Sequence, residues 1–394
     1  MNDVPNLRRQ ERRQAERAHL QSSVLVKLFL MNSQIVGLGV AEPSHSIERD
    51  RSIEFAQSLL YNPGKEARAL PALYRMTSVQ HRGSVLLSND DEDVCATQTF
   101  YPAANCPDQR GPSTNRRMAR YASEALPLAR QACQNAIVDA AIETCSITHI
   151  IVVTCTGFYS PGLDVELIEQ LDLDPETQRV QVGFMGCHGA INGLRVARGL
   201  IAAQPDATVL MVCIELCSLH YQYGWDPDRV VSNAIFADGA AAVVLNAAGS
   251  TNAVFPAVIE TGSRLVLDSK AAMTWRIGDS GFEMTLSAEV PGLIEAKLRA
   301  FITSWLGKQG LTIADIGGWA AHPGGPRILR AVETSLELSS TALACSRAVL
   351  ADHGNMSSAT MLFILRRFMD SNVPRPWLML GFGPGLEIEV ALIV

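Results

Sequence analysis

Three short segments of the chain each place a reactive side chain in a turn of small residues. Cys187 stands in a Gly-Cys-His-Gly segment, His322 opens a His-Pro-Gly-Gly-Pro segment, and Asn355 lies in a Gly-Asn-Met-Ser segment. A thiol, an imidazole and a neutral amide are the groups needed to form and use an acyl thioester. Residues that act together in catalysis are neighbours in space rather than in sequence, so we expect the fold to assemble these three.

Cys187 is the strongest candidate for a nucleophile. It follows a stretch that predicts a strand and precedes one that predicts a helix, and its small neighbours permit a tight turn that exposes one side chain. A helix N-terminus favours negative charge, so we expect a lowered thiol pKa. The alternative is an inert buried cysteine.

His322 and Asn355 each have a structural alternative. His322 could be an ordinary core histidine, and Asn355 could cap the helix expected after it, although Ser357 or Ser358 would serve equally well as the cap. His188 and His353 adjoin the candidate residues. Adjacent side chains diverge along a chain, so His322 is the preferred histidine.

The composition is that of a large globular protein. The chain has 394 residues, 47% of them hydrophobic, and this length predicts two domains or half-domains. A formal net charge of -7 argues against binding of nucleic acid. Nine cysteines without a Cys-Xaa-Xaa-Cys pair argue against a disulfide framework or a zinc site. We therefore predict no metal and a reducing, cytoplasmic location.

An alternation of apolar runs and amphipathic stretches predicts an α/β protein. Short runs rich in valine and isoleucine predict buried strands, and apolar residues at helical spacing predict helices. The expected strands are residues 35–40, 149–154, 179–183, 209–216, 240–245, 317–321, 377–382 and 386–394. The expected helices are residues 52–60, 122–141, 163–171, 190–203, 291–306, 326–336 and 356–368.

The alternation runs through both parts of the chain, so we expect two similar α/β halves. The N-terminal half is predicted to span residues 34–252 and to carry Cys187. The C-terminal half is predicted to span residues 253–394 and to carry His322 and Asn355. Residues 1–33 hold a charged run and an apolar run too short to span a membrane, so we expect a flexible extension there.

The motifs together resemble those of a known enzyme family. From about residue 35 to its end, the chain resembles the type III polyketide synthases, the chalcone-synthase-like branch of the thiolase fold. The resemblance rests on Met-Gly-Cys-His-Gly-Ala at 185–190, Phe-Ala-Asp-Gly-Ala-Ala at 236–241, His-Pro-Gly-Gly-Pro at 322–326 and Gly-Phe-Gly-Pro-Gly at 381–385. It implies a thiolase-like fold in which the two halves form a layered αβαβα core.

The resemblance implies a role for each reactive residue. Cys187 resembles the nucleophile that accepts an acyl group from an acyl-CoA starter. His322 and Asn355 resemble the pair that promotes decarboxylation of malonyl-CoA and stabilises the enolate, which then attacks the Cys187 thioester. Repeated condensation and ring closure complete the reaction. CoA thioesters are the substrates, and no metal or redox cofactor is implied.

Other positions match residues that shape the substrate cavity of this family. Phe236 and Met284 match the two gatekeeper positions, and Trp275 stands where chalcone synthase has glycine. Thr156 and Cys217 match positions that line an acyl tunnel in bacterial relatives. Trp275 would fill the space that an aromatic starter needs, which indicates an aliphatic one.

Three charged residues and one tyrosine complete the comparison. Glu215 resembles a buried carboxylate near the family's active site, and such a group needs polar partners. Arg75 resembles a cation that binds the CoA phosphates, and Arg82 is a second candidate for that role. Tyr221 is large for a wall of an acyl tunnel, which argues against a long one.

The leading interpretation is a bacterial-type enzyme that makes alkylpyrones or alkylresorcinols from aliphatic acyl-CoA. A maker of small-starter products is the next alternative, followed by a single-condensation β-ketoacyl synthase III-like enzyme and by a non-catalytic acyl-binding scaffold. The resemblance also implies a homodimer, in which Ser160 replaces a methionine that plant members extend across the interface. A carrier protein is a second acyl donor that the resemblance allows.

Overall fold

The computed structural model describes residues 33–61, 64–88, 98–247 and 255–394. Most of the expected extension at 1–33 and the expected junction at residue 252 therefore lie outside the described residues. Ser33, which the sequence analysis assigned to the extension, is instead the first residue of strand β1 (Ser33–Ala41).

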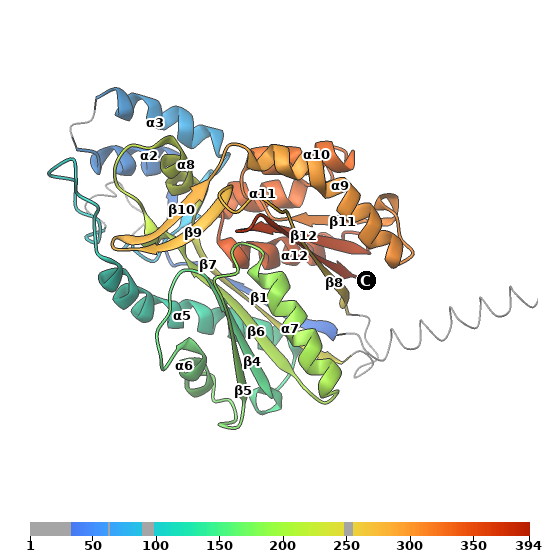
Figure 1. Ribbon diagram of the computed structural model, residues 1–394. Coiled ribbons are helices and arrows are strands. Elements are labelled where there is room, and N and C mark those ends of the chain that lie inside the picture. Colours follow the sequence, from blue (N-terminus) through green and yellow to red (C-terminus); the bar gives the residue numbers. More distant parts are fainter. Residues whose placement is uncertain (1–32, 62–63, 89–97, 248–254) are drawn as a thin grey trace, which may run out of the picture.

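Nine strands form the framework of the molecule (Figure 1). The N-terminal part contributes β1, β4 (His149–Thr154), β5 (Gln178–Gly183), β6 (Val209–Leu216) and β7 (Asp238–Ala247). The C-terminal part contributes β8 (Ala257–Leu265), β11 (Gly318–Ala321), β12 (Trp377–Gly383) and β13 (Glu387–Ile393). Their hydrogen-bonded order is β11-β12-β13-β8-β1-β7-β6-β4-β5.

This order shows that the two halves are similar. In each half, the strand at the β1–β8 contact is the first one in the chain, and its neighbour is the last one in the chain. The remaining strands of that half follow outward from there. Among the described residues, only two residue pairs join β1 to β8, so the strands of the N-terminal and C-terminal halves are called the N-terminal and C-terminal sheets below, although they meet in one strand order. The predicted pair of similar α/β halves is confirmed.

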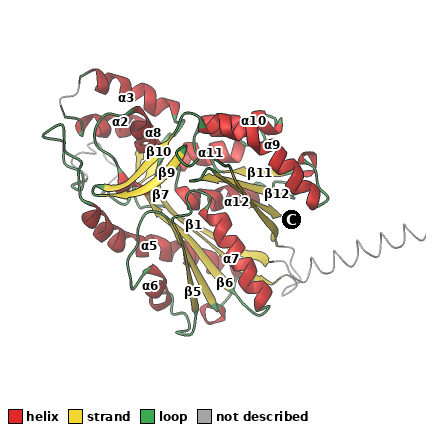
Figure 2. Ribbon diagram, viewed as in Figure 1, coloured by secondary structure: helices red, strands yellow, loops and turns green. Residues whose placement is uncertain are grey.

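Helices cover both faces of each sheet, and Figure 2 shows the helices that lie on the outer faces. The N-terminal half has α5 (Thr114–Ala140), α6 (Leu163–Gln170) and α7 (Gly189–Ala203), and the C-terminal half has α9 (Val290–Lys308), α10 (Pro326–Leu336), α11 (Ala344–His353) and α12 (Thr360–Asp370). Helices α7 and α12 contact strands of both sheets, while α5 packs on the N-terminal sheet and α9 on α10. The result is the predicted αβαβα layering.

The core residues record these layers. In β4, Ile150 belongs to a cluster shared with α5, whereas Ile151 belongs to the central cluster shared with α7 and α12. In β12, Leu378 belongs to the cluster with α9 and α10, whereas Met379 faces the central cluster. Side chains alternate across a strand, so a strand buried on both faces reads as the continuous apolar run seen in the sequence.

Several elements around the site were not expected from the sequence. They are α3 (Lys65–Met76), α8 (Pro227–Ile235), the short strands β2 (Ser46–Glu48) and β3 (His81–Gly83), and the hairpin of β9 (Met273–Gly278) and β10 (Gly281–Leu286). Helices α2 (Arg49–Ser58), α3 and α8 pack together beside this hairpin (Figure 1). They stand above the strand ends where the N-terminal sheet meets α7.

Candidate active site

Cys187 lies in the turn between β5 and α7, as the sequence predicts. The turn bends through positive φ angles at Phe184 (59°) and Gly186 (88°). A Cβ at Gly186 would lie 2.4 Å from Cδ of Pro384, so the turn is seated directly on the Gly-Phe-Gly-Pro-Gly segment. The Gly186 N–H also donates to Sγ of Cys155 at 3.2 Å. These contacts hold the nucleophile candidate at the N-terminal end of α7.

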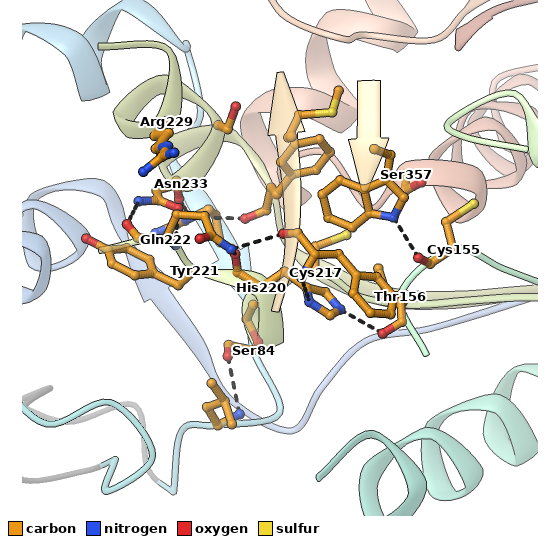
Figure 3. Close-up of a pocket in the computed structure, with 18 of the residues that line it drawn as sticks. Ser84, Cys155, Thr156, Cys217, His220, Tyr221, Gln222, Arg229, Asn233 and Ser357 are labelled. Carbon is orange, nitrogen blue, oxygen red and sulfur yellow. Dashed lines mark hydrogen bonds between the residues drawn. The ribbon is translucent and has the colours of Figure 1, made fainter. Parts of the chain in front are cut away.

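Cys187 lines a large cavity that spans about 1170 Å³ of empty space, with the open solvent at its mouth included. Figure 3 shows part of the lining of this cavity. In Figure 3, Ser357 and Cys155 lie at one end, and Arg229 and Tyr221 lie at the other. Nine of the residues singled out in the sequence line it: Arg82, Thr156, Cys187, Cys217, Tyr221, Phe236, Trp275, Met284 and Ser357. Glu215, His322, Asn355 and Arg75 are not on its wall.

Asn355 is buried, and its side chain is oriented by its own loop. Its Oδ1 accepts from the Ser357 N–H at 2.8 Å, which leaves the amide nitrogen free to donate elsewhere. The side chains of Ser357 and Asn355 both hydrogen-bond toward Cys187 and favour its thiolate. Asn355 therefore does not cap the helix after it, whose N-cap residue is Ala359, and it still offers a neutral donor to the nucleophile candidate.

The backbone of Asn355 is also tied to the gatekeeper segment. Its N–H donates to Ile235 O at 2.8 Å, and its carbonyl accepts from the Ala237 N–H at 2.9 Å. Phe236 stands between these two bonds and lines the cavity. The loop of one half thus fixes a cavity residue of the other.

His322 lies at the end of β11, where its N–H donates to Leu380 O at 2.8 Å. The ring is 1% exposed, and neither ring nitrogen has a hydrogen-bond partner among the described residues. Burial, with a smaller contribution from the neighbouring His188, lowers the pKa of His322 to about 3. The imidazole is therefore neutral and buried, and it takes up a proton only when an opposite charge forms beside it.

The expectation of a lowered thiol pKa at Cys187 is wrong for the ligand-free site. Burial raises the pKa of Cys187 to about 12, and the Glu215 carboxylate adds to this, while Ser357 and Asn355 act in the opposite direction. The helix terminus does not outweigh the loss of water around a thiolate. Transfer of the thiol proton to His322 would create two opposite charges together, whose attraction in a dry site offsets part of both burial costs.

Glu215 is fully buried at the end of β6 and bridges the two halves. Its carboxylate accepts from the Cys155 N–H at 3.0 Å, from Thr156 Oγ1 at 2.8 Å and from Ser358 Oγ at 2.6 Å. Burial raises the pKa of Glu215, and these hydrogen bonds lower it. The polar partners expected for this carboxylate are therefore a backbone amide and two hydroxyls.

The unexpected β9–β10 hairpin forms one wall of the cavity. Trp275 and Met284 are cross-strand neighbours on it, and the Trp275 indole N–H donates to Cys155 O at 2.8 Å. His220 supports the same wall: the Phe282 N–H donates to its Nδ1 at 2.9 Å, and its Nε2 lies 2.7 Å from Thr156 O. The sequence analysis missed His220, which ends the short 3-10 turn Cys217–His220 after the buried strand that carries Glu215.

The cavity is lined by one of the two cations expected from the sequence, Arg82, and by one that was not expected, Arg229. Arg75 is 61% exposed, lies off the cavity wall and is 3.9 Å from Asp50. Arg82 lines the cavity, but its guanidinium donates to the carbonyls of Asn233 and Phe236. Arg229, which the sequence analysis missed, lines the cavity without a side-chain partner in the described part of the chain.

The described residues include neither a membrane-spanning helix nor a side-chain cluster that would hold a metal ion. Every helix in these ranges is too short or too polar to span a bilayer. Over the same ranges, no group of three or more histidine, cysteine or acidic side chains has an arrangement that would hold a metal ion.

Comparison with known proteins shows the family. Residues 96–249 match the N-terminal domain of chalcone and stilbene synthases, and residues 258–394 match their C-terminal domain. The alpha-pyrone synthesis polyketide synthase-like protein Pks18 of Mycobacterium tuberculosis is 31% identical over 364 residues, which are 90% of this chain and 89% of that protein. The 1,3,6,8-tetrahydroxynaphthalene synthase of Streptomyces peucetius is 31% identical over 92% of this chain and 93% of that protein.

A solved structure shows the same architecture. The crystal structure of PKS-I from the brown alga Ectocarpus siliculosus aligns with a TM-score of 0.85 at 29% identity, over 92% of this chain and 98% of that one. The predicted thiolase-like fold and the predicted family are both confirmed. The chain belongs to the chalcone and stilbene synthase family of type III polyketide synthases and is an acyltransferase.

Proposed function

We propose that Cys187, His322 and Asn355 carry out iterative decarboxylative condensation of malonyl-CoA onto an acyl group held on Cys187. The observation that supports this most strongly is the placement of Cys187 in a cavity wall, with an amide donor of Asn355 directed to it. The sequence predicts this trio, and the proposal is supported by the position of Cys187 in the N-terminal half and of His322 and Asn355 in the C-terminal half.

Loading and extension follow from this arrangement. Cys187 Sγ attacks the thioester carbonyl of the starter, and the CoA thiolate leaves with the proton that His322 has held. Malonyl-CoA then loses carbon dioxide, and its enolate attacks the Cys187 thioester. One proton is taken up in each condensation, and it returns the Cys187 thiolate to the thiol as the β-ketoacyl-CoA leaves.

The two partners have distinct tasks in this proposal. Asn355 donates to the oxygen that becomes negative in the enolate and in the tetrahedral intermediate. His322 stores the thiol proton, and its low pKa in the ligand-free site makes it return that proton readily. Because both groups are neutral at rest, the site needs no resident counter-ion.

The walls favour an aliphatic starter and a pyrone or resorcinol product. Trp275 and Met284 narrow one side of the cavity, and Tyr221 limits the other. Thr156 and Cys217 are small side chains on the cavity wall, so they leave room for an alkyl chain beside them. The M. tuberculosis relative is named for alpha-pyrone synthesis, which supports the same product class.

We propose that Arg229 binds the phosphates of CoA at the mouth, with Arg75 as a more distant contact. Arg229 lines the cavity and has no carboxylate partner among the residues that the structure describes. The Arg82 guanidinium is already used to hold two backbone carbonyls. A carrier protein that presents the same thioester arm would enter by the same mouth.

We propose a cytoplasmic homodimer. Strand β5 stands at the end of the strand order and is paired on one side, to β4, so its other edge is available for a second copy. Ser160 is exposed on the loop after β4. All eight cysteines in the described ranges are free thiols, as in a reducing compartment.

The test is product mass spectrometry with malonyl-CoA and a series of acyl-CoA starters from acetyl to stearoyl, with Cys187→Ala as the matched control. We expect pyrones or resorcinols extended by several malonyl units from a medium or long starter, and none from the control. A best starter of two or three carbons would support the small-starter alternative. A single-condensation product would contradict the proposal.

A further inference from the structure

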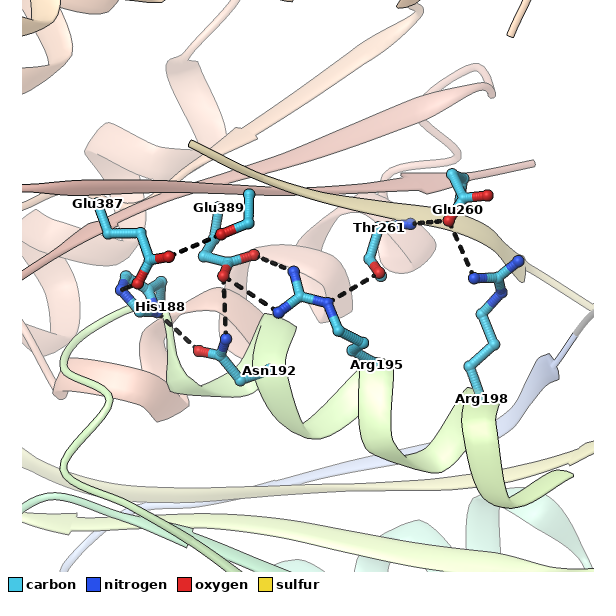
Figure 4. A network of polar contacts seen from close by, with 9 residues as sticks. His188, Asn192, Arg195, Arg198, Glu260, Thr261, Glu387 and Glu389 are labelled. Carbon is cyan, nitrogen blue, oxygen red and sulfur yellow. Dashed lines mark hydrogen bonds and ion pairs between the residues drawn. The ribbon is translucent and has the colours of Figure 1, made fainter. Parts of the chain in front are cut away.

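A second polar network begins at the residue beside Cys187 and leads away from the cavity (Figure 4). His188 is fully buried, and its Nδ1 lies 2.7 Å from Oδ1 of Asn192. Asn192 Nδ2 donates to Glu389 Oε1 at 3.1 Å, and Arg195 forms a two-pronged ion pair with the same buried carboxylate. None of these groups takes part in the chemistry proposed above.

The network fixes where the proton of His188 resides. The Asn192 amide nitrogen is directed to Glu389, so its oxygen faces His188 and can only accept. His188 must therefore carry its proton on Nδ1. Its Nε2 lies 3.7 Å from Oε2 of Glu387, beyond hydrogen-bond distance.

The Gly-Phe-Gly-Pro-Gly segment closes on the other side of this ring. A Cβ at Gly381 would lie 2.7 Å from Cβ of His188, and one at Gly383 would lie 2.4 Å from its Cδ2 and Nε2. Pro384 meets Gly186 one residue before Cys187. The two glycines of the hairpin therefore leave space for one imidazole, directly behind the nucleophile.

The network also crosses between the halves. Asn192 and Arg195 lie on α7 of the N-terminal half and His188 is its N-cap residue, whereas Glu387 and Glu389 lie on β13 of the C-terminal half. Figure 4 shows these α7 side chains reaching toward the strands. Cys187 belongs to the first half and His322 to the second, so their separation depends on how these elements are joined.

We propose that His188 is a positioning residue: its ring, held by Asn192 and enclosed by the Gly381 and Gly383 backbone, sets the Cys187 turn against the strand end that carries His322. This inference rests on the catalytic roles proposed above. His188 touches neither substrate nor thioester, and it acts through the placement of Cys187.

The first test compares two substitutions of the same shape. His188→Asn keeps a donor at the Nδ1 position, and His188→Leu does not. We expect kcat for His188→Asn within about threefold of the wild type and kcat for His188→Leu about tenfold or more lower, because Oδ1 of Asn192 is then buried without a donor. The KM for malonyl-CoA should change by less than about threefold, since the cavity wall is intact.

The second test displaces the His188 ring by a substitution elsewhere, so that no polar side chain is removed. Gly383→Ala should lower kcat about tenfold through its contact with His188, whereas Gly199→Ala, on the same α7 with open space around it, should not. Equal kcat for the Asn and Leu variants, or a wild-type kcat for Gly383→Ala, would overturn the proposal. If the Leu variant fails to fold, Gly383→Ala alone decides. Product formation by Cys187→Ala would instead refute the proposed function.

Discussion

Replacing Trp275 with glycine should change which starters the enzyme accepts. The indole forms part of the cavity wall beside Met284, and its N–H donates to Cys155 O at 2.8 Å. A tryptophan side chain covers about 150–250 Å² when buried, so its removal opens room for several methylene groups of an acyl chain. Each methylene transferred from water into that space contributes about 0.8 kcal/mol, which is about fourfold in kcat/KM.

The assay is internal competition among acyl-CoA starters of increasing length, together with an aromatic acyl-CoA, read by product mass spectrometry. We expect Trp275→Gly to favour starters two or three methylenes longer than the wild-type optimum by about 15-fold or more and to accept the aromatic one. Trp275→Phe is the matched control: it keeps the wall and removes the hydrogen bond, so it should lose about 1 kcal/mol of stability with little change in starter preference. A Trp275→Gly profile within twofold of the wild type would refute this account of the wall.

Four further predictions concern charges in and around the site. His322→Gln should move alkylation of Cys187 by iodoacetamide to higher pH, because the thiol loses its proton acceptor and its own pKa is about 12; identical pH profiles in both proteins would contradict the pair. Asn355→Asp keeps an acceptor for Ser357 but loses the donor, so release of carbon dioxide from malonyl-CoA should fall about 100-fold or more; a loss below tenfold would argue against an oxyanion role. Burial raises the folded-state pKa of Glu215 above its unfolded value, so its stabilising share is full below the unfolded pKa and is lost as pH rises through the folded one. Urea unfolding should therefore show Glu215→Gln gaining on the wild type as pH rises from about 4.5, and the opposite trend would refute this. Arg229→Gln should raise the KM for malonyl-CoA about five- to tenfold with little change in kcat, and an unchanged KM would remove Arg229 from the CoA site.

The strands that are buried on both faces could be predicted most accurately from the sequence. Strands β4 and β6 have the predicted bounds, because a continuous run of β-branched residues between two helical layers has no competing interpretation. The β9–β10 hairpin was missed, since its strands mix polar and apolar residues and one face lines a cavity instead of a core. The helix expected at 356–368 begins at Thr360, after a tighter turn that includes Ser357.

The sequence predicts which reactive residues form the site better than it predicts their burial and their pKa values. Reactive residues in turns of small residues identified Cys187, His322 and Asn355, and the structure places Cys187 and Asn355 together. The pKa of the Cys187 thiol was expected to be lowered and is instead raised, because the sequence shows the helix terminus but not the burial. His220 and Arg229 were missed because nothing in their local pattern distinguishes them from ordinary loop and helix residues.

The most direct test of the central claim is to map the acyl group on the enzyme. The protein is mixed with an acyl-CoA starter without malonyl-CoA, quenched in acid and digested, and the modified peptide is identified by mass spectrometry. Three cysteines, Cys155, Cys187 and Cys217, line the same cavity, so the position of the label discriminates among them. We predict a thioester on Cys187 alone, consumed when malonyl-CoA is added. An acyl group on Cys155 or Cys217, or one that malonyl-CoA leaves unchanged, would contradict the account.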